Sequence, residues 1–129
     1  MQGPRKEVMN RDRILRRALW FSVPYNIGGA ALFAFPSSPF GQFAALPTSV
    51  PLLYHALLGF FVLLFGGAYA WLAMQREIDR PMVALAAIGK AGVFTLILVL
   101  WMVGSAPARG VLAAGGDLVL AAIFAWYLM

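Results

Sequence analysis

The sequence contains no cysteine and a single histidine, and these absences exclude several kinds of chemistry. A chain without cysteine has no disulfide, no catalytic thiol and no thiolate-ligated zinc or iron–sulfur centre. One histidine, His55, is too few for a histidine-rich metal site, and haem ligation by two histidines would need a second chain. We therefore expect no metal site in the chain, and we retain His55 only as a candidate ligand at a membrane interface.

Charged residues are also scarce. Only 12% of the residues are charged and 62% are hydrophobic, whereas soluble domains have about a quarter of their residues charged and about half apolar. This composition predicts a small integral membrane protein. No P-loop, HExxH or GxSxG motif occurs, and little sequence lies outside the apolar segments to hold one. An enzyme is therefore not the first interpretation.

Four apolar segments are each long enough to cross about 30 Å of hydrocarbon as a helix. They cover residues 18–35, 50–74, 82–103 and 111–129. We therefore predict an all-α integral membrane bundle of four transmembrane helices in residues 18–129, preceded by a basic tail in residues 1–17. Because Pro24 and Asn26 interrupt the first apolar run, we expect it to be retained as a span and not cleaved as a signal peptide. The longest connection, 36–49, is expected to be a re-entrant or surface segment.

Basic residues gather on one side of the predicted membrane domain. Arg76 and Arg80 fall in the connection that lies on the same side as the N-terminus, and Arg109 alone lies on the other side. Six more basic residues lie in the tail: Arg5, Lys6, Arg11, Arg13, Arg16 and Arg17. The positive-inside rule therefore places both termini in the cytoplasm. We expect the tail to set this topology and to contact anionic lipid headgroups, and not nucleic acid, because no aromatic-interleaved basic surface follows.

Lys90 and Asp117 are ionisable residues inside predicted spans, where an unpaired charge costs roughly 2.5–3.5 kcal/mol. At about 1.5 Å per residue, Lys90 lies ~12 Å below the cytoplasmic end of the third span, and Asp117 lies ~18 Å from that end of the fourth. The difference of about 6 Å matches the length of a lysine side chain. We therefore predict that Lys90 and Asp117 pair. A structural role that fixes helix register and a functional site remain equally open interpretations of this pair.

Three other polar side chains are expected near the same depth. Asn26 falls at the level of Lys90 in the first span, with Tyr25 beside it, and Tyr69 lies toward the cytoplasmic half of the second span. We expect Tyr25, Asn26 and Tyr69 to converge on Lys90 and Asp117 inside the bundle. Asparagine and tyrosine within spans most often form interhelical hydrogen bonds, and proton donation by the tyrosines is the alternative role.

Residues 14–129 combine several features in a fixed order: a basic N-terminal tail, a first span that ends at Pro36, PTSVPLLYHALLGFFVLLFGGAYAWLAM, a short charged turn, IGKAGVF and GGDLVLAAIFAWYL. In this order they resemble the DoxX-like family of small four-helix bacterial membrane proteins. The resemblance implies a multi-pass protein of the bacterial inner (cytoplasmic) membrane. Some members are accessory subunits of quinone-linked oxidoreductase complexes. The family has no residue-level catalytic motif that transfers to this sequence.

The favoured function is an accessory or structural subunit of a larger bacterial membrane complex, with a quinone- or redox-linked complex as one option. The alternative is a small homo-oligomeric transporter or lipophile-binding protein that uses a Lys90–Asp117 centre. An enzyme acting on a quinone or a lipid is the least supported function. The sequence requires no cofactor, and a quinone or a lipid is the candidate ligand. Expected partners are membrane lipids and either other membrane subunits or further copies of this chain.

Overall fold

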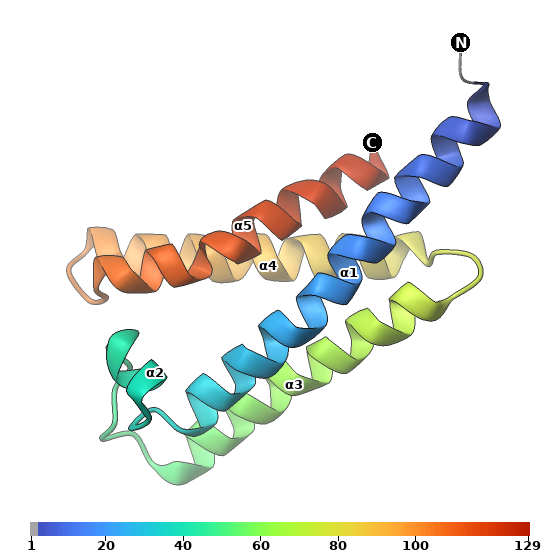
Figure 1. The fold of residues 1–129 in the computed structure, drawn as a ribbon. Coiled ribbons are helices and arrows are strands. Elements are labelled where there is room, and N and C mark those ends of the chain that lie inside the picture. The colour runs from blue at the N-terminus through green and yellow to red at the C-terminus, as the bar shows by residue number, and fades with distance from the viewer. Residues whose placement is uncertain (1–2) are drawn as a thin grey trace.

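A computed structural model describes residues 3–129, in which the secondary structure is entirely helical. The elements are α1 (Pro4–Ala34), α2 (Pro39–Phe43), α3 (Leu52–Met74), α4 (Arg80–Met102) and α5 (Ala108–Leu128). The predicted all-α class is thus confirmed. Figure 1 shows four long helices, with both chain ends and the α3–α4 connection at one end of the molecule. The short α2 and the α4–α5 connection lie at the other end, which we call the α2 end.

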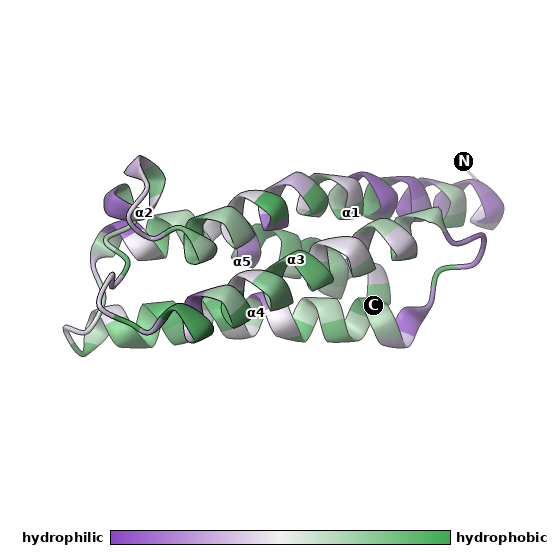
Figure 2. Ribbon diagram, turned by 90° about the horizontal axis from the view of Figure 1, so that it is seen from below, coloured by the Kyte–Doolittle hydropathy of each residue, from purple (hydrophilic) through white to green (hydrophobic). Residues whose placement is uncertain are grey.

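Three of the long helices, α3, α4 and α5, are long and apolar enough to cross a membrane. Their length and composition support the predicted membrane character of the chain. The first helix does not reach the same apolarity, because its N-terminal half carries the basic tail and Pro24 and Asn26 interrupt the rest. Figure 2 shows this contrast as a hydrophilic N-terminal part of α1 beside largely hydrophobic neighbouring helices. The fourth span and the sidedness of the termini therefore remain predictions.

Local sequence signals explain where most helices begin. In α1, Pro4 occupies the first turn, and the helix continues without a break from the predicted tail into the predicted span and past Pro24 within it. At the start of α4, the Asp79 carboxylate accepts a hydrogen bond from the Met82 N–H at 3.1 Å, and a proline again occupies the first turn. The 36–49 connection contains the five-residue helix α2, in which the Ser38 hydroxyl accepts a hydrogen bond from the Gly41 N–H at 3.2 Å.

The long helices form two hairpin-like pairs, α1 with α3 and α4 with α5. Contacts within each pair are far more extensive than contacts between the pairs. The α1–α3 pair is close because glycines face α1: a Cβ added at Gly59 would lie 3.0 Å from the Ala30 carbonyl oxygen and the Ala34 Cβ. A Cβ added at Gly66 would lie 3.2 Å from the Asn26 Cβ. Small residues thus allow the two backbones to approach, as is common between helices in membranes.

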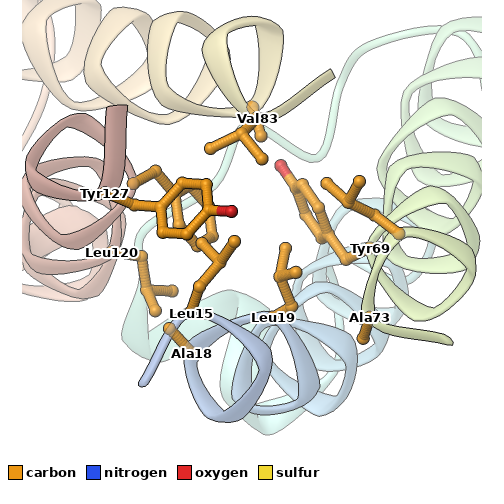
Figure 3. Close-up of a cluster of buried hydrophobic side chains, with 11 residues drawn as sticks. Leu15, Ala18, Leu19, Tyr69, Ala73, Val83, Leu120 and Tyr127 are labelled. Carbon is orange, nitrogen blue, oxygen red and sulfur yellow. The ribbon is translucent and has the colours of Figure 1, made fainter. Parts of the chain in front are cut away.

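The two pairs meet in an apolar core near the chain ends (Figure 3). Leu15 and Leu19 from α1, Val83 from α4 and Phe124 from α5 are fully buried there, beside Tyr69 of α3. The buried residues of α4 are Val83, Ala86 and Lys90. All three lie in the first half of that helix, and no residue of its second half is fully buried, although some are half-buried against α5. The two pairs therefore separate beyond Lys90, toward the α2 end (Figure 1).

Basic side chains close the end of the molecule at which the termini lie. The Arg16 guanidinium donates hydrogen bonds to the Ala73 carbonyl at 2.6 Å and the Arg76 carbonyl at 3.1 Å, where α3 ends. The Arg80 guanidinium donates to the Leu128 carbonyl at 2.6 Å, where α5 ends. A positive charge beside unpaired C-terminal carbonyls is favourable, because these carbonyls carry the negative end of the helix dipole.

Candidate functional site

Lys90 is buried at the point where the two helix pairs separate, with only 3% of its side chain exposed. Its Nζ lies 2.7 Å from Asp117 Oδ1 across the α4–α5 pair, and this is the one ion pair among residues 3–129. The Asp117 side chain is 15% exposed. The structure therefore brings together the two residues whose depths in the sequence predicted a pair.

Asn26 extends this contact from the α4–α5 pair to the α1–α3 pair. The Lys90 ammonium donates a hydrogen bond to Asn26 Oδ1 at 3.3 Å. The other side of the same amide donates from Nδ2 to the Val62 carbonyl of α3 at 3.0 Å. One asparagine therefore links α1, α3 and α4, and both ends of its amide are used.

Two tyrosine rings complete the surroundings of the ammonium. The Lys90 Nζ lies 5.1 Å from the ring centroid of Tyr25 and 5.0 Å from that of Tyr69. A cation at this distance from an aromatic ring is stabilised by the ring quadrupole. The Tyr25 hydroxyl also donates a hydrogen bond to the Ala113 carbonyl of α5 at 2.5 Å. All five residues predicted to converge in the membrane thus form one cluster, Tyr25, Asn26, Tyr69, Lys90 and Asp117, which we call the Lys90 cluster.

A glycine on α5 makes room for one of the two rings. A Cβ added at Gly116 would lie 2.6 Å from Cε2 of Tyr25 and 2.9 Å from its hydroxyl oxygen. A Cβ added at the neighbouring Gly115 would meet nothing within 4 Å. Gly116 is therefore a member of the site that the sequence analysis did not identify, although its position beside Asp117 was a visible signal.

The Lys90 ammonium, at the centre of the Lys90 cluster, is surrounded by interaction partners from the chain itself. An ammonium has three N–H donors, and here it meets a carboxylate, an amide oxygen and two aromatic faces, while almost none of it is exposed. These contacts offset the cost of placing a charge in an apolar environment. Such an arrangement joins helices well, but it leaves little space at the ammonium for a further ligand.

His55 lies apart from the cluster. It is in the first turn of α3, 14 positions before Tyr69, which corresponds to about 21 Å along a helix. Its Nε2 is buried and has no hydrogen-bond partner within the described residues. Across residues 3–129, no group of three or more potential ligand side chains is placed to hold a metal ion.

Some contacts of the cluster had no signal in the sequence. The carbonyls of Val62 and Ala113 accept hydrogen bonds from Asn26 and Tyr25, and any residue type supplies a carbonyl. The hydrogen bond from the Tyr127 hydroxyl to Asp12 Oδ1, at 3.0 Å, joins the C-terminal end of α5 to α1 across 115 positions and was also not foreseen.

Comparison with known proteins found no matching family model and no significantly similar curated protein or solved structure. The functional proposal for this chain therefore depends on its own residues and contacts.

We predict that removal of either charge of the Lys90–Asp117 pair destabilises the protein more than removal of both. Lys90→Met or Asp117→Leu alone leaves a buried charge without its partner, at a cost of about 3–5 kcal/mol, whereas an apolar pair of similar size is nearly neutral. The double variant should therefore recover most of the lost free energy of unfolding.

The measurement is a double-mutant cycle on the detergent-solubilised chain, with unfolding followed by circular dichroism. Arg13→Met, which removes an exposed charge in α1, is the control and should change the unfolding free energy little. Additive losses in the double variant would show that the two side chains are not coupled.

The adjacent glycines of α5 give a matched test of the Tyr25 position. Gly116→Ala should displace the Tyr25 ring and lower the unfolding free energy by about 1–3 kcal/mol, the usual cost of overpacking. Gly115→Ala meets open space and should be neutral or stabilising by up to about 1 kcal/mol, because alanine is the better helix former. Equal thermal stability of the two variants would contradict this packing.

Proposed function

We propose that this chain is an accessory or structural subunit of a larger membrane assembly. The observation that carries the proposal is a set of glycines with no neighbour inside the chain. A Cβ would meet nothing within 4 Å at Gly28 of α1, Gly67 of α3, Gly89 and Gly92 of α4, and Gly115 of α5. Glycine in a helix costs about 1 kcal/mol relative to alanine, and in membranes it is enriched where another helix backbone approaches closely. Open glycines on all four long helices therefore support contacts with helices of other chains.

The exposed half of α4 supports the same proposal. Gly89 and Gly92 lie three positions apart and so share one face of α4. Val93 and Leu96 near this face are 45% and 60% exposed. No residue of α4 after Lys90 is fully buried. A neighbouring helix packed along this face would cover surface that the described chain leaves open.

In this proposal the Lys90 cluster holds the two helix pairs together. Its ammonium is enclosed and its partners come from α1, α3 and α5, which favours a fixed link over a site that takes up and releases a substrate. The resemblance to DoxX-like proteins agrees with a subunit role, and a quinone- or redox-linked complex is one such assembly.

A second candidate is a homo-oligomeric transporter or lipophile-binding protein. One observation favours it: the Asp117 side chain remains 15% exposed, and it contacts Lys90 through one oxygen, Oδ1. A ligand with a hydrogen-bond donor would find the second carboxylate oxygen at the place where the helix pairs separate.

The proposed topology has four spans, with α1 as the first and both termini in the cytoplasm of a bacterial cell. Its support is that the apolar half of α1 packs along α3, through Asn26 to Val62 and through Ala30 to Gly59, so both helices occupy the same depth. Arg16 and Arg80 lie at the end of the molecule where the termini are, whereas the Arg109 guanidinium lies 5.6 Å from the Phe43 ring at the α2 end. This asymmetry satisfies the positive-inside rule.

The subunit proposal predicts that the tagged chain copurifies with a fixed set of other membrane proteins after gentle solubilisation. The measurement is the mass and composition of the assembly eluted through a tag on the N-terminal tail. Gly89→Leu/Gly92→Leu should release the partners, because it fills the open face of α4, while the helical content of the chain stays unchanged. Ala56→Leu, at an exposed alanine of α3, is the control. A homo-oligomer without other subunits would refute this proposal and favour the second candidate.

The absence of cysteine gives a direct test of the topology. Single cysteines at Glu7 and Glu77 should react with a membrane-impermeant maleimide only after the cells are opened. Single cysteines at Thr48 and Ser105 should react in intact spheroplasts. All four positions are exposed, so burial does not limit labelling. Labelling of Glu7→Cys and Thr48→Cys from the same side would show that α1 does not cross the membrane.

A further inference from the structure

A shallow apolar groove runs along the outer face of α5 next to α1. Its volume is about 550 Å³, and it is open along its length, so it can enclose only part of a bound molecule. Its lining is Ile14, Leu118, Val119, Ala122, Ile123 and Trp126. Ile14 belongs to α1 and the other five residues belong to α5. The groove is separate from the Lys90 cluster, because none of the cluster residues lines it.

The length of the groove matches one leaflet of a membrane. Leu118 and Trp126 are eight positions apart on α5, which is about 12 Å of helix. The hydrocarbon of one leaflet is about 15 Å deep, half of the usual core thickness. Trp126 lies near the end of α5 and Leu118 lies beside Asp117 at the level of the Lys90 cluster. The groove therefore extends from the edge of the membrane to its middle.

Two arginines of α1 lie beside the groove, Arg11 at its outer end and Arg17 about 4.5 Å farther along α1 than Ile14. The Arg11 guanidinium is 5.1 Å from the Trp126 ring centroid. Arg17 is exposed and lies three positions after Ile14, as Arg11 lies three positions before it, so both arginines flank Ile14 on α1. Within residues 3–129 neither guanidinium has a carboxylate oxygen within 4 Å. Asp12, the residue after Arg11, accepts a hydrogen bond from the Tyr127 hydroxyl.

We propose that this groove binds one anionic phospholipid. An acyl chain lies along α5 from Trp126 toward Leu118, and the phosphate is held by Arg11 and Arg17. Charge-assisted hydrogen bonds from guanidinium to phosphate are among the stronger polar contacts, and each arginine near an anionic surface contributes about fivefold in affinity. An apolar groove of about one leaflet's depth, beside two arginines that have no carboxylate partner among the described residues, favours a lipid of negative charge over a neutral one. This inference requires a membrane-embedded chain but is independent of the subunit role.

The test is quenching of Trp126 fluorescence by lipid. The full chain with Trp20, Trp71 and Trp101 changed to phenylalanine retains Trp126 as the single tryptophan. It is reconstituted into phosphatidylcholine vesicles containing graded fractions of phosphatidylglycerol with brominated acyl chains. Half-maximal quenching should require at least fivefold less brominated phosphatidylglycerol than brominated phosphatidylcholine. Equal quenching by the two lipids would overturn the proposal.

Matched variants separate the groove from general attraction to the basic tail. Arg11→Gln/Arg17→Gln should remove most of the preference for phosphatidylglycerol. Arg5→Gln/Lys6→Gln removes the same charge farther out on α1 and should retain the preference. Ala122→Phe fills the groove and should abolish saturable quenching, whereas Ala125→Phe, at an exposed position outside the lining, should not.

Two results would refute the site. Equal losses in both charge variants would show diffuse attraction only. Full quenching in Ala122→Phe would show that the lipid does not occupy the groove. Circular dichroism of each variant verifies that the helices are intact before quenching is compared.

Discussion

The arrangement of the helices depends on the buried Lys90 ammonium, which must be paired with polar or aromatic groups. Lys90 lies in an apolar helix with 3% of its side chain exposed, where an isolated positive charge is strongly unfavourable. Its partners come from three other helices: Asp117 from α5, Asn26 from α1 and the Tyr69 ring from α3. The electrostatic requirement of one residue therefore becomes a positional constraint on the whole bundle.

This constraint acts where ordinary packing is weakest. Within each helix pair, small residues bring the backbones together, as at Gly59 and Gly66 against α1. Between the pairs, the apolar core occupies only the half of the molecule near the chain ends and stops at Lys90. Because lipid tails are as apolar as the side chains, burial of apolar surface gives helices in a membrane little reason to associate. Polar contacts at the inner edge of the core therefore carry an unusual share of the connection between the pairs.

Much of the fold and of the cluster was predictable because, in a helix that crosses a membrane, the position of a residue in the sequence gives its depth. The Lys90–Asp117 pair followed from this arithmetic, and the convergence of Tyr25, Asn26 and Tyr69 followed from the need to satisfy polar groups in one small bundle. Depth does not determine lateral arrangement, so the separation of the helix pairs beyond Lys90 had no signature in the sequence. Carbonyl acceptors and the Arg16 and Arg80 contacts at helix ends were also not foreseen, since they depend on which helices are neighbours.

The order of the elements along the chain has a consequence for biosynthesis. Lys90 precedes Asp117 by 27 positions, so at ordinary translation rates it is made roughly 1–5 s before its carboxylate partner. The α1–α3 pair, by contrast, is complete before Lys90 is made, and it presents the Asn26 amide and two tyrosine rings. Asn26 and the two tyrosine rings can therefore contact the Lys90 ammonium as α4 enters the membrane. The ion pair with Asp117 forms afterwards. The N-terminal pair can thus act as a template for assembly of the α4–α5 pair, which carries the buried lysine and its aspartate.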